Sequence, residues 1–149
     1  GGPFRIGGAV IQPIPVWHGV LPVYGYRIGT LAYISDVSSI PAPSMERLRG
    51  LDILILDAVR YRPHSTHFHL DAAIDVARQV NARRTIFTHL NHDFLHRRLS
   101  GKLPRQMEAG YDGLVVEACT EWRTNDLRPG NIEEPAPLAV QRTRNPIDS

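Results

Sequence analysis

The stretch LDILILDAV, residues 51–59, constrains the fold of this 149-residue chain more than any other. It is almost continuously apolar over the length of one strand, which is typical of a strand buried on both faces. An amphipathic helix is predicted next in HLDAAIDVARQVNA, since apolar side chains recur at helical spacing at Leu70, Ile74, Ala77 and Val80. RTIFT, residues 84–88, predicts a second short strand. A strand, a helix and a strand in succession indicate an α/β or α+β layered domain.

The part of the chain before this unit is predicted to be rich in strands. Short apolar pieces broken by Gly and Pro indicate strands and turns over residues 4–16. Two aromatic and β-branched runs flank Gly29 and Thr30, which predicts a hairpin. Pro43 and Ser44 favour a helix start and Gly50 favours its end, so a short helix is expected between them.

After the RTIFT strand we expect a polar loop or helical turn at 91–98 and a final strand in GLVVEA, residues 113–118. The sequence therefore predicts one folded portion over residues 1–118. Residues 119–149 are rich in Pro and Arg without periodicity, and we predict an extended or disordered tail there.

Composition excludes several classes of function. The formal charge of +2 is too small to favour a nucleic-acid partner, and no apolar run reaches the length of a membrane span. Cys119 is the only cysteine, which excludes an internal disulfide and indicates a reducing, cytoplasmic location. The chain begins GGPFRIGG, without an initiator Met or the regions of a signal peptide, so we expect a piece of a longer or processed polypeptide.

Four polar residues follow or end predicted strands: His18, Asp36, Asp57 and His89. Loops at strand ends are where rigid scaffolds present functional groups, so four such residues in one small domain predict a common site. Each has an ordinary alternative. His18 taken alone is more often a surface or hydrogen-bonded histidine, and Asp36 could cap the turn that follows it.

Two further clusters hold most of the remaining histidines. His64, His67 and His69 lie just before the predicted helix. Thr66 or His69 could simply cap that helix, and the alternative is that a histidine here donates a proton to a leaving group. In THLNHD, His92 and Asp93 are placed to support His89 through hydrogen bonds, or they form a purely structural pair. His96 is expected to be a surface residue.

In this order and spacing, the motifs PVWHG, YISDV, LDILILDAVRYRPHSTHFHLDAA, TIFTHLNHD and AGYDGLVVE resemble the metallo-β-lactamase superfamily. The resemblance is strongest to its phosphoribosyl cyclic-phosphate phosphodiesterase (PhnP-like) branch. It covers His18 to Glu117 and implies the C-terminal half of an αββα sandwich. The superfamily's HxHxDH motif would precede His18, and no histidine does so in this chain.

The resemblance implies a role for each motif residue. His18, Asp36 and His89 would be metal ligands, with Asp36 bridging two divalent ions, Zn or Mn. His67 would donate a proton to the leaving oxygen after attack by a metal-activated hydroxide. Apart from the resemblance, the residue patterns themselves place His64, His92, Asp93 and Arg60 as residues that support the site or contact substrate, since an arginine can pair with a phosphate.

The resemblance also predicts partners and limits. The expected substrate is a small phosphodiester, and this chain alone is expected to hold at most one ion weakly and to be inactive. Half of a sandwich would expose an apolar face, so we expect it to pack against the missing N-terminal half or a second copy. The alternatives are a non-catalytic fragment or degenerate module, and the same fold hydrolysing a thioester, a lactone or a β-lactam.

Overall fold

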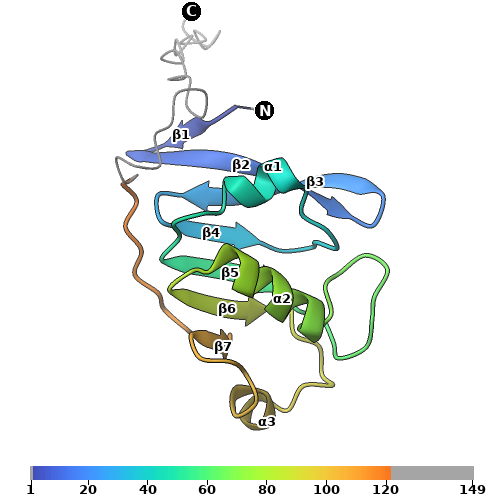
Figure 1. Ribbon diagram of the computed structural model, residues 1–149. Helices are drawn as coiled ribbons and strands as arrows, with labels where there is room; N and C mark the ends of the chain where they lie inside the picture. Colours follow the sequence, from blue (N-terminus) through green and yellow to red (C-terminus); the bar gives the residue numbers. More distant parts are fainter. Residues whose placement is uncertain (1, 122–149) are drawn as a thin grey trace, which may run out of the picture.

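The computed structural model describes residues 2–121, which form one mixed seven-stranded sheet (Figure 1). The strands lie side by side in chain order: β1 (Phe4–Ile6), β2 (Ala9–His18), β3 (Leu21–Ile28), β4 (Leu31–Ile34), β5 (Ile53–Asp57), β6 (Arg84–Thr88) and β7 (Met107–Ala109). Strands β1 to β4 pair antiparallel, and β4 to β7 pair parallel. The predicted α/β class is confirmed. The tail predicted from 119 lies outside the described residues beyond position 121.

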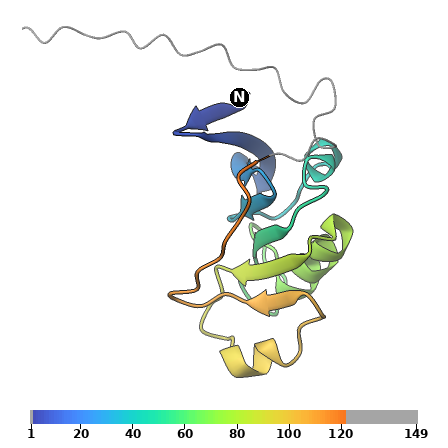
Figure 2. The ribbon, with the colours of Figure 1, turned by 90° about the vertical axis from the view of Figure 1, so that its left-hand side faces the viewer.

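Three helices connect the strands: α1 (Ala42–Glu46), α2 (Leu70–Val80) and α3 (His96–Ser100). The side view shows α1 and α2 on one face of the sheet, while residues 111–121 run along the other side (Figure 2). Within residues 2–121, no helix combines the length and the apolar character needed to cross a membrane.

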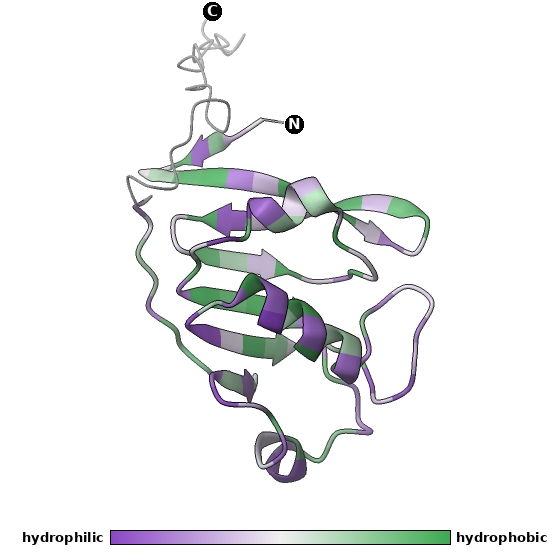
Figure 3. Ribbon diagram, viewed as in Figure 1, coloured by the Kyte–Doolittle hydropathy of each residue, from purple (hydrophilic) through white to green (hydrophobic). Residues whose placement is uncertain are grey.

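The helix-covered face of the sheet forms the core. Leu54 and Leu56 of β5 point to this face, as does Phe87 of β6, and all three are fully buried. Helix α2 packs on them through Leu70, Ala73 and Ala77. Its hydrophobic side faces the sheet and its hydrophilic side faces outward (Figure 3). The helical periodicity of the sequence therefore predicted both the helix and the face it buries.

The opposite face of the sheet carries a row of large side chains that none of the helices within residues 2–121 covers. The strand register aligns Tyr26, Tyr33, Ile55 and Ile86 across β3, β4, β5 and β6. Tyr26 and Tyr33 remain 41% and 45% exposed. Strand β5 thus has apolar side chains on both faces, as its sequence predicted, although helices cover only one of them. We call the row Tyr26, Tyr33, Ile55 and Ile86 the open face.

Local conformation explains where helix α2 begins and ends. The N-cap residue of α2 is His69, and no side chain accepts a hydrogen bond from the first backbone amides of the helix. Helix capping by Thr66 or His69 therefore does not explain why histidines gather before the helix. Asn81 ends the helix in the left-handed region at φ 54°, a conformation that asparagine tolerates better than most residues.

The predicted strand at 113–118 is wrong. The last strand is β7, Met107–Ala109, and it pairs with β6 through Thr85, Ile86 and Phe87. Residues 114–120 are extended but pair with no strand. The β-branched GLVVEA segment instead crosses toward the β3–β4 turn, where the Thr30 amide donates to the Cys119 carbonyl at 3.1 Å. Leu114 and Val116 of this segment line a pocket together with Ile55 and Ile86, so the apolar pattern reflects packing beside the sheet and not a strand within it.

Candidate active site

Four polar residues meet at one edge of the sheet. Asp57 ends β5, while Asp36 and His89 closely follow the parallel strands β4 and β6. His18 ends β2, which runs in the same direction as β4 because two antiparallel pairings separate them. In open α/β sheets, ligands bind outside the carboxyl ends of the strands, which is where these side chains lie.

Backbone conformation aims two of these side chains. Asp36 and His89 both adopt left-handed backbone conformations, with φ of 55° and 57°. Such a conformation costs energy for a residue other than glycine, and strained residues cluster at functional sites. Each residue therefore turns the chain sharply after its strand, and the two side chains approach one another.

The site is compact. His89 Nδ1 lies 3.7 Å from Asp36 Oδ1 and 3.5 Å from Ser35 Oγ. The ring of His67 lies at the centre, with centroid distances of 4.6 Å to His18 and 4.8 Å to His89. The structure therefore brings together His18, Asp36, His67 and His89, the four residues to which the sequence assigned direct roles.

Asp57 is a candidate site residue to which the sequence motifs assign no role. It was grouped with the strand-end residues but given no role. Its side chain is 0% exposed, and Oδ2 accepts hydrogen bonds from His67 Nδ1 at 2.7 Å and from the Val37 amide at 3.2 Å. A carboxylate that ends an apolar strand is costly unless it is paired, and this was the available signal.

The loop between β5 and α2 presents His64 beside His67, with ring centroids 5.1 Å apart. The Arg60 guanidinium donates to the carbonyls of Arg62 and Pro63, so it braces this loop. Desolvation, followed by the positive charge of Arg60 and by His67, lowers the pKa of His64 below its ordinary value. The neutral form of His64 is therefore favoured near neutral pH.

The other predicted supporting residues lie apart from His89. The His92 side chain is 96% exposed, and its nearest partner is Asp93 at 3.8 Å. Asp93 is held by Asn91, whose side-chain amide donates to its carboxylate at 3.0 Å. Among residues 2–121, the polar partners of His89 are Ser35 and Asp36. His96 is exposed, as expected, and contacts the Ala109 carbonyl from α3.

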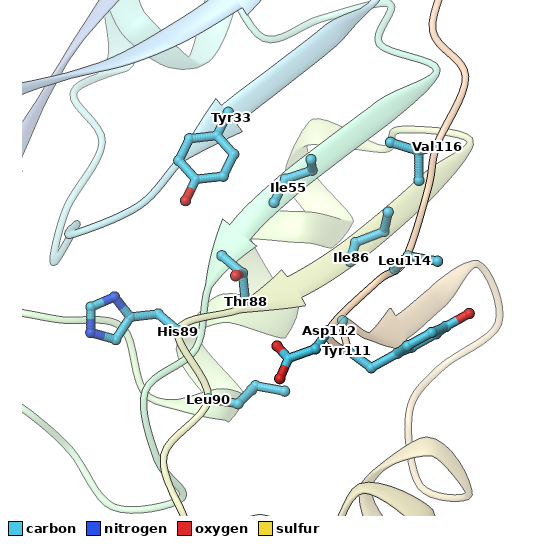
Figure 4. A pocket seen from close by; sticks show the side chains of 11 residues that line it. Tyr33, Ile55, Ile86, Thr88, His89, Leu90, Tyr111, Asp112, Leu114 and Val116 are labelled. Carbon is cyan, nitrogen blue, oxygen red and sulfur yellow. The ribbon is translucent and has the colours of Figure 1, made fainter.

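A pocket of about 400 Å³ leads from the site onto the open face (Figure 4). Tyr33, Ile55 and Ile86 form its sheet side, and His89 lies at the end nearest the site. The remaining lining residues are Thr88, Leu90, Gly110, Tyr111, Asp112, Leu114 and Val116. The site is thus continuous with the side of the sheet that carries the open face, part of which residues 111–121 cover.

The donor atoms fit a divalent cation. Two groups of three residues place their ligand atoms within 4.8 Å of one another: His18, Asp36 and His67, and also Asp57, His67 and His89. Two polar atoms at the site, His18 Nδ1 and Asp57 Oδ1, are buried without a hydrogen-bond partner among the described residues. Imidazole nitrogens and carboxylate oxygens together suit Zn²⁺ or Mn²⁺.

Comparison with known proteins identifies the fold family. The model of the beta-lactamase superfamily domain matches residues 1–90. The chain belongs to the metallo-β-lactamase superfamily. This superfamily consists of hydrolases, and the resemblance stated from the sequence motifs is confirmed.

The branch of the metallo-β-lactamase superfamily is also confirmed. The crystal structure of a diphosphatase of the PhnP family is 44% identical to this chain, with a TM-score of 0.79 over 82% of it. The chain covers 48% of that protein. An octanoyltransferase of Porphyromonas gingivalis is 34% identical over 114 residues, which are 75% of this chain but 23% of that protein.

A more distant structure agrees on the metallo-β-lactamase fold. YhfI of Bacillus subtilis, a metallo-β-lactamase-fold protein, is 21% identical, with a TM-score of 0.63 over 75% of this chain and 51% of its own. The chain thus spans about half the length of these solved structures, or less than a quarter in the case of the octanoyltransferase.

Proposed function

We propose that this chain forms half of a divalent-metal-dependent phosphodiesterase site, of the kind that cleaves a small cyclic phosphate or other phosphodiester. The observation that carries the proposal is the convergence of His18, Asp36 and His89 around His67, which the buried Asp57 orients. The 44% identity to a PhnP-family diphosphatase favours phosphate ester or anhydride chemistry over other hydrolyses of this fold.

His18, Asp36 and His89 would hold the metal. Asp36 would supply a negatively charged oxygen ligand, and His18 and His89 would supply neutral imidazole nitrogens. Divalent ions, when bound, supply Lewis acidity that activates water and offsets the charge of the phosphate. Zn²⁺ and Mn²⁺ both fit this donor set.

His67 is assigned to proton transfer although it belongs to both candidate ligand groups. Its Nδ1 is occupied by the bond to Asp57, which leaves Nε2 to exchange a proton with the leaving oxygen. The Asp57 carboxylate accepts the hydrogen bond from Nδ1 and so fixes the tautomer and the orientation of the ring. The side chain of His67 is 13% exposed, so it is accessible while largely shielded from bulk water.

The open face is proposed to bind the complementary half of the sandwich, which would carry the HxHxDH motif. Strand β5 is apolar on both faces, and the pocket that begins at His89 continues under the position such a partner would occupy. The solved PhnP-family structure is about twice as long as the part this chain matches. A second copy of this chain is the competing occupant.

Hydrolysis of two phosphodiesters tests the proposed reaction. The chain is combined with a polypeptide that supplies the complementary, HxHxDH-bearing half of the fold, and loaded with Zn²⁺ or Mn²⁺. One substrate has a p-nitrophenolate leaving group, which departs without protonation, and the other has an alkoxide leaving group, which requires a proton.

Asp36→Ala should abolish hydrolysis of both phosphodiesters. His67→Ala should slow the alkyl ester by about 100-fold or more while affecting the p-nitrophenyl ester far less. His92→Ala removes an exposed histidine and serves as the control. Equal losses on both esters would refute proton donation, and turnover of a thioester, lactone or β-lactam without phosphodiester hydrolysis would refute the substrate class.

Sedimentation of the 149-residue chain tests the partner. The expected result is association with a separately expressed segment that supplies the complementary, HxHxDH-bearing half of the fold. This association should be lost when Tyr33→Lys and Ile55→Lys are introduced together. Self-association without affinity for that segment would favour the second copy, and a stable, dilute monomer that binds neither would contradict the proposal.

A further inference from the structure

His64 is fixed in one tautomer by its neighbour in the loop. Its Nδ1 lies 3.2 Å from the Thr66 backbone nitrogen in hydrogen-bonding geometry, and 3.3 Å from Thr66 Oγ1. A backbone amide can only donate, so Nδ1 of His64 must accept and carry no proton. The proton of the neutral ring is therefore on Nε2.

His67, three residues later, is held in the opposite tautomer. Its Nδ1 faces the buried Asp57 carboxylate at 2.7 Å, so this nitrogen carries the proton. The two neighbouring imidazoles, His64 and His67, thus differ in which ring nitrogen carries the proton. His67 presents Nε2 as the nitrogen that exchanges a proton, whereas His64 presents a permanent N–H group.

The loop around His64 is locked against the β2–β3 turn. A Cβ on Gly19 would lie 2.9 Å from Thr66 Cγ2, so the turn next to His18 and the Thr66 side chain are in close contact. The Gly19 amide in turn donates to Ser38 Oγ at 2.9 Å. Arg60 braces the other side of the loop through its bonds to backbone carbonyls. His64 is consequently held in place before any ligand arrives.

We propose that His64 is a substrate-binding residue that donates its Nε2–H to an oxygen of the anionic substrate, beside the proton-transferring His67. This assignment rests on the proposed function, since it places the phosphate at the same site. A fixed neutral donor, with a guanidinium nearby, binds a phosphate oxygen without competing with His67 for its proton.

The tautomers can be measured without metal and without activity. Two-bond ¹H–¹⁵N correlation spectra of the ¹⁵N-histidine-labelled chain distinguish protonated from bare ring nitrogens. At neutral pH we expect Nε2–H for His64 and Nδ1–H for His67, with His64→Gln and His67→Gln providing the assignments. Thr66→Ala retains the backbone amide and should leave His64 unchanged. An Nδ1–H tautomer of His64, or its reversal in Thr66→Ala, would overturn the inference.

Binding of inorganic phosphate to the metal-free chain tests the donor role. His64→Ala should weaken phosphate binding on the order of tenfold, as expected for the loss of one hydrogen bond to a charged group. His92→Ala, which removes a histidine far more exposed than His64, should bind phosphate like the wild type. Equal affinities of His64→Ala and wild type, or no measurable binding by the wild type, would overturn the proposal. The tautomer spectra and the phosphate affinity do not depend on metal-dependent hydrolysis. If hydrolysis is not observed, they therefore still test the role of His64 independently of the proposed function.

Discussion

Replacement of Asp57 should separate the fold of this protein from its chemistry. Asp57→Ala removes the acceptor of two hydrogen bonds, from the Val37 amide and from His67 Nδ1. It also removes Oδ1, a buried oxygen without a partner among the described residues. Asp57→Asn is the matched variant, because its carbonyl oxygen can still accept both bonds while the negative charge is lost.

The structure sets the scale of the two effects. The buried Val37 amide loses its partner at a cost of about 1–3 kcal/mol. Two effects limit any further loss. The His67 ring can hydrogen-bond to water instead of Asp57, and folding no longer has to bury a charged carboxylate. The net loss of stability therefore stays within about 1–3 kcal/mol. The rate should suffer more, because a proton donor whose tautomer and charge are no longer held loses on the order of 10²–10⁴-fold. Asp57→Asn should lie between wild type and Asp57→Ala in rate.

Three measurements check this prediction. Urea denaturation gives the stability, the alkyl and p-nitrophenyl phosphodiesters give the leaving-group dependence, and ¹⁵N spectra give the His67 tautomer. In Asp57→Ala, the alkyl ester should be affected most, and His67 should become a mixture of tautomers. If Asp57→Ala keeps a pure Nδ1–H His67 and the wild-type ratio of the two rates, the orienting role of Asp57 is wrong.

Two further predictions concern the scaffold. Gly19→Ala should destabilise the chain by about 1–3 kcal/mol, because Gly19 has φ +61° and its new Cβ would clash with Thr66. Gly7→Ala is the matched control, because Gly7 has φ +57° but a Cβ there would meet nothing within 4 Å. The free energy of unfolding of both variants is measured by urea denaturation. An equal loss of stability in the two variants would show that the contact with Thr66 contributes nothing. Leu56→Ala, in the fully buried core, should cost about 2–5 kcal/mol. Ile55→Ala on the open face should cost the isolated chain clearly less, and equal midpoints in thermal unfolding would contradict a one-sided core.

The sequence predicted most of the sheet and its site because those features depend on local patterns. The run before Asp57 and the helical spacing of residues 70–80 each produced the expected element. The candidate site residues could be proposed because polar side chains directly after apolar strands are unusual, and parallel strands bring them to one edge.

What the sequence missed depends on contacts between distant segments. The bond between Asp57 and His67 joins residues whose separation of ten positions implies no contact in an irregular loop. The 113–118 segment has the composition of a strand, but β7 occupies the position next to β6 in the sheet. The segment therefore has no free edge of β6 to pair with and lies outside the sheet. His92 and Asp93 are near His89 in the chain, yet the turn after β6 directs them to solvent.

Titration of the 149-residue chain with Zn²⁺, followed by calorimetry, tests the central claim that His18, Asp36 and His89 form a metal site. The account predicts weak uptake of one ion by the wild type, lost in Asp36→Ala and His89→Ala and retained in His92→Ala. Wild-type affinity in Asp36→Ala, or loss of binding in His92→Ala, would show that the ion binds elsewhere and would contradict the proposed site.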